Sequence, residues 1–323
     1  MNRRTFLKAA GLSVAVTPLS ALAIDPLPRD GAGPLKLSLS AYSMRQYLKA
    51  AAAAEGAAAE GREADGPDAD GAIDLLGFVE YCRSLGVPGA ELTSYYFPPG
   101  FAASPDEEHV SDVAYLAGLK RHCHVAGVSI SGGAIRNDFC VRTEDVGVQL
   151  DHFRRWADVY DILGAPAIRV FGGNVPKGDG LDETVERCVA ALTEAADYAG
   201  RRGVWVALEN HGGITADPEV MLRLIRGVQA DWFGVNFDSG NFATEDPFEG
   251  LAKIAPYAVN AQIKVEMRRP DGSKHAADLE RVIKTLRDAG YGGWVALEYE
   301  AAEDPREAIP RWLDTLRPLL DAE

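Results

Sequence analysis

Short apolar runs alternate with longer segments of helical pattern along almost all of this 323-residue chain, and no other feature restricts its fold as strongly. The runs contain few polar breaks, which is typical of strands buried on both faces of a parallel sheet. One pentapeptide, Trp-Val-Ala-Leu-Glu, fills two of them, at 205–209 and 294–298, so the same buried strand ends twice on a glutamate. The runs lie at residues 35–42, 88–93, 127–132, 166–171, 203–209, 233–238, 258–265 and 293–299.

The segments between these runs have the length and periodicity of helices. They lie near residues 72–86, 109–126, 143–164, 181–202, 217–228, 247–256, 275–289 and 304–321. Strands that alternate with helices over about 290 residues predict an α/β fold, a single (β/α)8 TIM barrel that occupies residues 35–323. A doubly wound sheet is the alternative, but no Gly-x-Gly-x-x-Gly loop and no Walker pattern follows a strand.

The first 23 residues have the pattern of an export signal rather than of a folded element. Arg3 and Arg4 open a twin-arginine pattern, an apolar run follows, and Ala-Leu-Ala at 21–23 fits a cleavage site. The apolar run is too short for a membrane-spanning helix and a proline breaks it, so we expect no membrane contact after the signal is removed. Residues 24–34 are then a linker, and we expect the mature chain in the periplasm.

Residues 49–71 interrupt the alternation with a low-complexity insertion rich in Ala, Glu, Asp and Gly. The insertion has almost no large apolar side chain with which to build a core. It lies between the first predicted strand and its helix, and would therefore emerge beside the carboxyl ends of the strands. It is either a tolerated insertion without structure or a lid over the site.

Charge and cysteine content narrow the function further. A net charge of −15, which removal of residues 1–23 would bring to −18, argues against nucleic acid or an anionic membrane as a partner. The four cysteines form no Cys-x-x-Cys pair, which favours buried free thiols over disulfides or metal ligands. The sequence leaves open whether the chain forms a homo-oligomer.

Charged and amide side chains stand at the ends of the predicted strands, where the active sites of such barrels are built. Glu209, Asp238 and Glu298 end three strands, and Gln262 lies on the strand between the last two. Three carboxylates cannot share a small buried space without a cation, because their repulsion would force protonation. Carboxylate and amide oxygens suit hard ions, so the four residues predict a site for one divalent metal, Mn²⁺ or Mg²⁺.

Further polar residues surround this predicted metal set. His211 follows a buried strand directly, in Glu-Asn-His-Gly-Gly, which places it at the barrel mouth. Lys264 is costly to bury alone, and Glu266 or a substrate oxygen could be its partner. The residues predicted to bind substrate are Glu91, Asn137, Arg169, Lys177 and Glu266.

Six stretches of the chain resemble the sugar phosphate isomerase/epimerase family, the xylose isomerase-like TIM barrels. They are AELTSYYFP, GVSISGGAIRNDF, WVALENHGG, GVNFDSGNF, NAQIKVEM and WVALEYE, and the resemblance covers nearly all of 35–321. It implies metal ligands at the ends of the last four strands, usually Glu, Asp, His and Glu. Glu209, Asp238 and Glu298 match these positions. Gln262 stands where the family has histidine, and its amide oxygen can still bind a metal.

The resemblance implies a divalent-metal-dependent sugar isomerase or epimerase. The metal would polarise the carbonyl of a keto sugar. Of Glu209 and Glu298, one would remove the proton next to the carbonyl to give a metal-bound enediolate, and the other would return a proton. His211 and Lys264 are the candidates for stabilising the oxyanion, which completes the predicted catalytic set.

Three other functions were weighed against this one. A lyase or hydratase acting on 3-keto-glycosides would use the same enolate chemistry, and the predicted export favours it because glycosides occur outside the cell. A DNA-repair endonuclease would need a histidine-rich zinc cluster, yet only His211 follows a strand end, and the chain is acidic. A sugar-binding barrel without activity would not need the complete set of acids. A small-molecule sugar or glycoside is therefore the expected partner.

Overall fold

The computed structural model describes residues 25–29, 31, 33–48, 71–98, 101 and 110–322. The predicted export signal at 1–23 and residues 49–70 of the predicted insertion lie outside this part of the chain.

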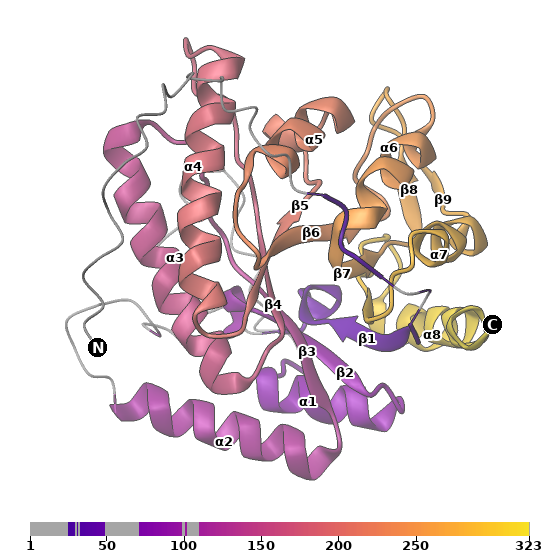
Figure 1. The fold of residues 1–323 in the computed structure, drawn as a ribbon. Helices are drawn as coiled ribbons and strands as arrows, with labels where there is room; N and C mark the ends of the chain where they lie inside the picture. Colours follow the sequence, from indigo (N-terminus) through magenta and orange to yellow (C-terminus); the bar gives the residue numbers. More distant parts are fainter. Residues whose placement is uncertain are drawn as a thin grey trace, which may run out of the picture.

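Eight parallel strands close into a barrel in the order β1-β10-β7-β6-β5-β4-β3-β2 (Figure 1), which confirms the predicted fold. The two copies of the repeated pentapeptide supply β5 and β10, with β6 and β7 between them. Each copy is buried from its second residue onward. The strands are β1 (Lys36–Ser40), β2 (Gly89–Thr93), β3 (Ser129–Ala134), β4 (Ala167–Val170), β5 (Trp205–Glu209), β6 (Phe233–Asp238), β7 (Ala258–Ile263) and β10 (Trp294–Leu297).

Helices surround the strands in Figure 1, and each of the eight predicted helical segments contains one. In α7 the buried residues recur at the spacing of one helical face, at Leu279, Val282, Ile283 and Leu286, and pack toward the strands. The helices are α1 (Leu75–Ser84), α2 (Val110–Ala126), α3 (Thr143–Leu163), α4 (Leu181–Gly200), α5 (Pro218–Gly227), α6 (Pro247–Ile254), α7 (Leu279–Asp288) and α8 (Pro305–Asp321).

Aspartates fix where several of these helices begin. An aspartate side chain accepts a hydrogen bond from a free backbone N–H in the first turn, and a proline in that turn loses no bond. The sequence Asp-Pro starts α5, α6 and α8 in this way. The capping residues are Asp74, Asp217, Asp246, Asp278 and Asp304.

A two-stranded hairpin follows β7, and the sequence analysis did not predict it. Strands β8 (Glu266–Arg268) and β9 (Lys274–Ala276) pair antiparallel. The predicted strand at 258–265 therefore ends earlier, at Ile263, and the helix predicted from 275 begins at Leu279. The turn contains Pro-Asp-Gly, and Gly272 has φ +83°, a conformation that glycine adopts without strain.

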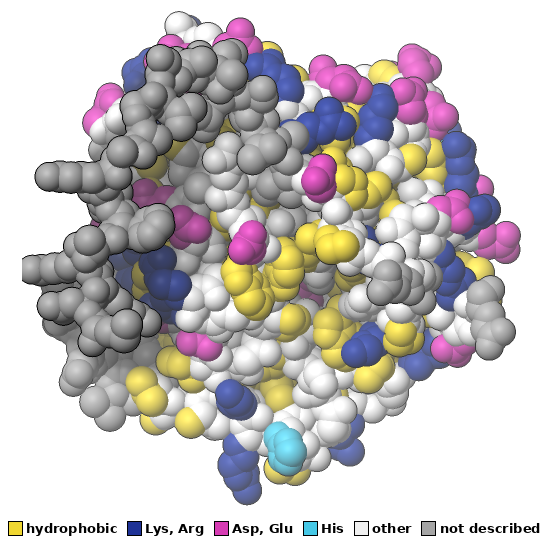
Figure 2. Space-filling model, in the orientation of Figure 1, with side chains coloured by type: hydrophobic (Ala, Val, Ile, Leu, Met, Phe, Trp, Pro, Cys, Tyr) yellow, Lys and Arg dark blue, Asp and Glu magenta, His cyan; other side chains and the backbone are white. Residues whose placement is uncertain are grey.

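All four cysteines are buried and free, as the absence of paired motifs predicted. None of the helices within the described residues is both long and apolar enough to cross a bilayer. On the face drawn in Figure 2, the Lys and Arg side chains are scattered among acidic and apolar ones rather than gathered into one patch.

Candidate active site

The polar residues predicted from the strand ends converge at the mouth of the barrel. Their side chains enter it from β2, β4, β5, β6 and β7 and from the residues that follow β7 and β10. None of them is more than 6% exposed, although all are charged or carry an amide. They are Glu91, Arg169, Glu209, Asp238, Gln262, Lys264 and Glu298.

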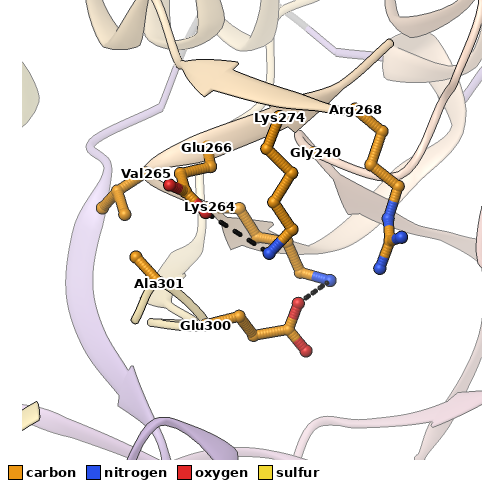
Figure 3. A pocket seen from close by; sticks show the side chains of 8 residues that line it. All are labelled: Gly240, Lys264, Val265, Glu266, Arg268, Lys274, Glu300 and Ala301. Atoms are coloured by element: carbon orange, nitrogen blue, oxygen red, sulfur yellow. Dashed lines mark ion pairs between the residues drawn. The ribbon is translucent and has the colours of Figure 1, made fainter. Parts of the chain in front are cut away.

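The ammonium of Lys264 lies at the centre of a group of carboxylates. Its Nζ is 3.2 Å from Asp238 Oδ2, 3.3 Å from Glu298 Oε2 and 2.9 Å from Glu300 Oε2. Figure 3 shows the last of these pairs, with Lys264 reaching toward Glu300. A side chain at Gly240 would place its Cβ 2.9 Å from the Cβ of Lys264, so glycine is required where the backbone passes this lysine.

A second ion pair holds Glu209 on the other side of the mouth. Arg169 Nε lies 2.9 Å from Glu209 Oε2, and its Nη1 donates to the carbonyl of Ile135 at 2.9 Å. The guanidinium also covers the Phe171 ring, 4.0 Å from its centroid. Asn241 donates from Nδ2 to Glu209 Oε1 at 3.0 Å, so both carboxylate oxygens of Glu209 have partners.

Four side chains form a closed hydrogen-bonded ring inside the barrel. Gln262 Nε2 donates to Glu91 Oε1 at 2.6 Å, and Asn236 Nδ2 donates to Gln262 Oε1 at 2.6 Å. Asn260 Nδ2 then donates to Asn236 Oδ1 and to Glu91 Oε2, both at 2.8 Å. Gln262 Nε2 also reaches Glu298 Oε1 at 3.3 Å, which connects the ring to the carboxylates above.

Burial and neighbouring charges separate the acids around Lys264 into two kinds. Burial raises the pKa of Asp238 to about 6 and that of Glu298 well above its ordinary value, although Lys264 acts in the opposite direction. Burial would also raise the pKa of Glu300, but Lys264 outweighs it and lowers that pKa. Glu300 is therefore the ionised partner of Lys264, and Glu298 favours its protonated form.

The two buried cations keep their charge. Burial disfavours the ammonium of Lys264, but Asp238, Glu298 and Glu300 outweigh burial and raise its pKa well above the ordinary value. Burial acts in the same direction on Arg169, where Glu209 more than compensates and raises the pKa. For Glu209 itself, burial raises the pKa while Arg169 and Lys264 lower it.

His211 lies at the mouth, as predicted, with one ring face against Phe171 at a centroid distance of 4.3 Å. The side chain still reaches solvent. Removal of water by the residues packed around the ring, together with the charges of Arg169 and Lys264, lowers the pKa of His211 to about 4. The imidazole is therefore neutral near pH 7 and can act as a hydrogen-bond donor or acceptor at the barrel mouth.

Three of the residues predicted to bind substrate lie outside the buried group of charged side chains at the barrel mouth. The amide of Asn137 pairs with the backbone of Phe171 at both ends, at 2.8 and 2.9 Å, and so joins the ends of β3 and β4. Lys177 is exposed on the loop after β4. Glu266 lies on the hairpin and pairs with Lys274 at 3.3 Å, so the sequence analysis was wrong to offer it as the partner of Lys264.

Sequence reasoning missed four residues of the site, namely Asn236, Asn241, Asn260 and Glu300. Period-two alternation could have found two of them, because residues two apart on a strand point to the same face. Asn236 precedes Asp238 by two residues on β6, and Asn260 precedes Gln262 by two residues on β7. Both members of each pair therefore point into the barrel.

The predicted metal ligands converge, but their oxygens already have partners. Asn241 and Arg169 contact the two carboxylate oxygens of Glu209, and the N–H of Gly240 and the ammonium of Lys264 contact the two oxygens of Asp238. Gln262 Oε1 accepts a hydrogen bond from Asn236. Glu298 accepts a hydrogen bond from Gln262 and forms an ion pair with Lys264. The described residues hold no group of three or more His, Cys, Asp or Glu arranged to bind a metal ion. Arranged in this way, the donor set does not fit a divalent cation.

A small pocket opens above Lys264, between the hairpin and the segment that follows β10. Figure 3 shows Arg268 and Lys274 of the hairpin directed toward it, while Glu300 closes the opposite side. A polar group of a substrate that entered here would approach Lys264 between charges of both signs. The residues that line the pocket are Gly240, Lys264, Val265, Glu266, Arg268, Lys274, Glu300 and Ala301.

Comparison with known proteins identifies the family to which this geometry is similar. The model of a family described as xylose isomerase-like TIM barrel matches residues 79–319. Comparison with curated protein sequences gives no significant match.

Solved structures resemble the whole barrel at low identity. D-psicose 3-epimerase with D-tagatose, from Clostridium cellulolyticum H10, has a TM-score of 0.66 and 14% identity, with 89% of this chain and 100% of that chain covered. The apo form of 3-keto-D-glucoside 4-epimerase from E. coli has a TM-score of 0.62 and 16% identity, with 88% and 99% covered. A xylose isomerase-like TIM barrel protein from Mycobacterium smegmatis, in complex with magnesium, has a TM-score of 0.64 and 17% identity, with 89% and 96% covered. At these identities the likeness shows the fold alone.

Proposed function

The chain belongs to the xylose isomerase-like TIM barrel family, and from this premise we propose that it is a sugar isomerase or epimerase. The proposed reaction moves a proton at a carbon next to the carbonyl of a keto sugar. One observation carries the proposal. The carboxyl groups of Glu209 and Glu298, which end the two copies of the repeated strand, both meet the buried ammonium of Lys264, Glu298 directly at 3.3 Å and Glu209 through the amide of Asn241.

Glu209 is the proposed base. Arg169 and Asn241 fix both of its oxygens, so its direction is set before substrate enters. Its carboxylate takes the proton from the substrate carbon, and the electron pair left behind forms the double bond of an enediolate while the carbonyl oxygen becomes negative. A base whose pKa is raised toward the working pH accepts a proton more readily than an ordinary glutamate.

Lys264 and Glu298 complete the proposed exchange. The ammonium of Lys264 donates a hydrogen bond to the developing oxyanion and offsets its charge in a site whose charged side chains are buried. Glu298, whose raised pKa favours the protonated form, then gives its proton to carbon. Delivery to the opposite face of the same carbon gives epimerisation, and delivery to the neighbouring carbon gives isomerisation.

No step of this proposal passes through a metal, because the oxygens of the predicted ligands are engaged by protein partners. The magnesium in one structural neighbour is a property of that protein. For this chain we propose a sugar or glycoside substrate and export to the periplasm, the latter from the pattern of residues 1–23.

A lyase or hydratase acting on 3-keto-glycosides is the second candidate. One structural neighbour is a 3-keto-D-glucoside 4-epimerase, and the same first step serves both reactions. If the C2 proton of a 3-keto-glycoside is removed, the electron pair can expel the substituent at C1 instead of returning to carbon.

Product analysis separates the two candidates. The protein without residues 1–23 is incubated with a panel of ketohexoses, ketopentoses and 3-keto-glycosides, and the products are followed by NMR. An epimer or an aldose–ketose pair supports the first proposal, and release of the C1 substituent supports the second. If every substrate of the panel is returned unchanged, both are contradicted.

A further inference from the structure

Lys264 occupies the position at which the carboxylates of this site would otherwise meet a cation. Its Nζ lies within 3.3 Å of three acids, Asp238, Glu298 and Glu300. The amide oxygen of Asn241 accepts from the same nitrogen at 3.0 Å. The ammonium therefore has four oxygen neighbours from two segments of the chain, residues 238–241 and 298–300, as a bound ion would.

Asp238 depends on this ammonium more than the other acids do. Its Oδ1 accepts from the backbone N–H of Gly240 at 2.8 Å. Its Oδ2 is buried and has no hydrogen bond of suitable geometry, and its partner is the charge of Lys264 at 3.2 Å. A divalent ion bound to that oxygen would lie close to the ammonium, and the two positive charges would repel each other.

The backbone holds the lysine in this position. Lys264 is only 6% exposed. Its Cβ and Cδ each lie 2.9 Å from the point where a side chain would start at residue 240, so its stem runs against Gly240. The N–H of Lys264 donates to Ser239 Oγ at 2.8 Å, which fixes the backbone on the other side. Such a side chain has little room to turn away and leave the carboxylates to another cation.

We propose that the ammonium of Lys264 takes the place of a divalent metal in this site, and that the chain binds no such ion at Asp238 and Glu298. The inference deepens the proposed function, on which its catalytic meaning rests. A fixed cation from the protein, rather than an exchangeable one, offsets the charge of the enediolate.

A metal titration tests this without using activity. The wild-type chain lacking residues 1–23 is treated with EDTA, desalted and titrated with Mn²⁺, and free Mn²⁺ is followed by its EPR signal. The same titration is run on Lys264→Met, which removes the ammonium and keeps an unbranched stem. Lys274→Met is the matched control. It removes a positive charge from the same pocket, but the ammonium of Lys274 pairs with Glu266 and not with Asp238 or Glu298.

We expect no Mn²⁺ to bind to the wild type or to Lys274→Met, and one ion to bind per chain in Lys264→Met. Mn²⁺ should also raise the Tm of Lys264→Met alone, since a ligand that binds only the folded state stabilises it. If Lys264→Met does not fold, the double variant Lys264→Met/Glu300→Gln replaces it, because it removes one acid together with the cation. The titration of the wild type tests the proposal whether or not the variants fold.

Two outcomes would overturn the inference. One is a wild type that binds one Mn²⁺ per chain and loses it in Asp238→Asn. The other is a folded Lys264→Met that binds no more Mn²⁺ than the wild type, which would mean that Lys264 is not what keeps the metal away. Failure of the proposed function would show instead as inactivity on every sugar, whatever the titration gives.

Discussion

Glu209 and Lys264 are joined by a single side chain, the amide of Asn241. Its Nδ2 donates to Glu209 Oε1 and its Oδ1 accepts from Lys264 Nζ, both at 3.0 Å. The proposed base and the proposed oxyanion partner therefore have a fixed separation. Asn241 touches both groups with opposite ends of one amide, so neither can turn without breaking a hydrogen bond.

Replacement of Asn241 should reduce turnover much more than folding. Asn241→Ala releases both groups, and misplacement of catalytic groups by about 1 Å can cost a factor of about 10². Asn241→Asp keeps the shape but places a carboxylate beside Glu209, which should raise the pKa of that base. We expect the acidic limb of the kcat/KM profile to move to higher pH in Asn241→Asp. An unchanged profile, with the variant folded by circular dichroism, would show that Asn241 does not position the base.

Replacement of Lys264 by Met should destabilise the protein strongly near pH 7. Removal of one partner from a buried ion pair costs about 3–5 kcal/mol, because the remaining charge is left uncompensated. The loss should shrink at lower pH, where Asp238 and Glu300 can take up protons. The urea midpoint measured from pH 5 to pH 8 checks this. A loss of stability that is equal at all pH values would contradict the account.

Asp238 should give the wild type a pH dependence of stability between about pH 4 and pH 6. Burial raises its folded pKa to about 6 from an ordinary value of 3.8. In this window the folded state binds more protons than the unfolded state, so stability falls as pH rises. Asp238→Asn removes the titrating group and should flatten this part of the curve, measured as the free energy of unfolding in urea. A variant as steep as the wild type would exclude Asp238 as the source.

Gly240→Ala should impair activity by displacing Lys264. The new Cβ would lie 2.6 Å from the carbonyl oxygen of Glu266 and 2.9 Å from the Cβ of Lys264, which is closer than the atoms can approach. Gly118→Ala is the control, because its Cβ meets nothing within 4 Å and alanine favours a helix by up to about 1 kcal/mol. We expect lower kcat and lower Tm in Gly240→Ala only. Equal activity in the two variants would mean that the lysine does not depend on this glycine.

The barrel was readable from the sequence because each strand and helix carries its own local pattern. The strand ends were also readable, since a charged residue that closes an apolar run can only point into the mouth. What was not readable is which groups pair there. Glu266, two residues away, or a substrate oxygen was expected as the partner of Lys264, but its partners in the structure come from β6 and from the segment after β10.

The hairpin after β7 and the closed hydrogen-bonded ring were not predicted from the sequence, for different reasons. The Pro-Asp-Gly turn at 270–272 lies between the strand predicted at 258–265 and the helix predicted at 275–289, and β9 falls where that helix was expected to start. Asn236 and Asn260 look like weak strand residues by propensity, because amides are depleted in strands. Asn236 bonds to residues of the neighbouring strand β7, and Asn260 also reaches Glu91 across the barrel on β2, and no local pattern specifies such contacts.

Deuterium exchange with single-site variants tests the central claim most directly, namely that Glu209 removes a proton from the substrate carbon and Glu298 returns one, with Lys264 beside both. The best substrate of the sugar panel is incubated in deuterated water with wild type, Glu209→Gln, Glu298→Gln and the double variant, and the label is located by NMR. We predict label at one carbon next to the carbonyl with wild type, none with Glu209→Gln, and exchange with little product from Glu298→Gln. Turnover should fall by about 10²–10⁴ in each single variant, and the double variant should be little worse, because groups that act together are not additive. Wild-type rates and labelling in both single variants would contradict the account.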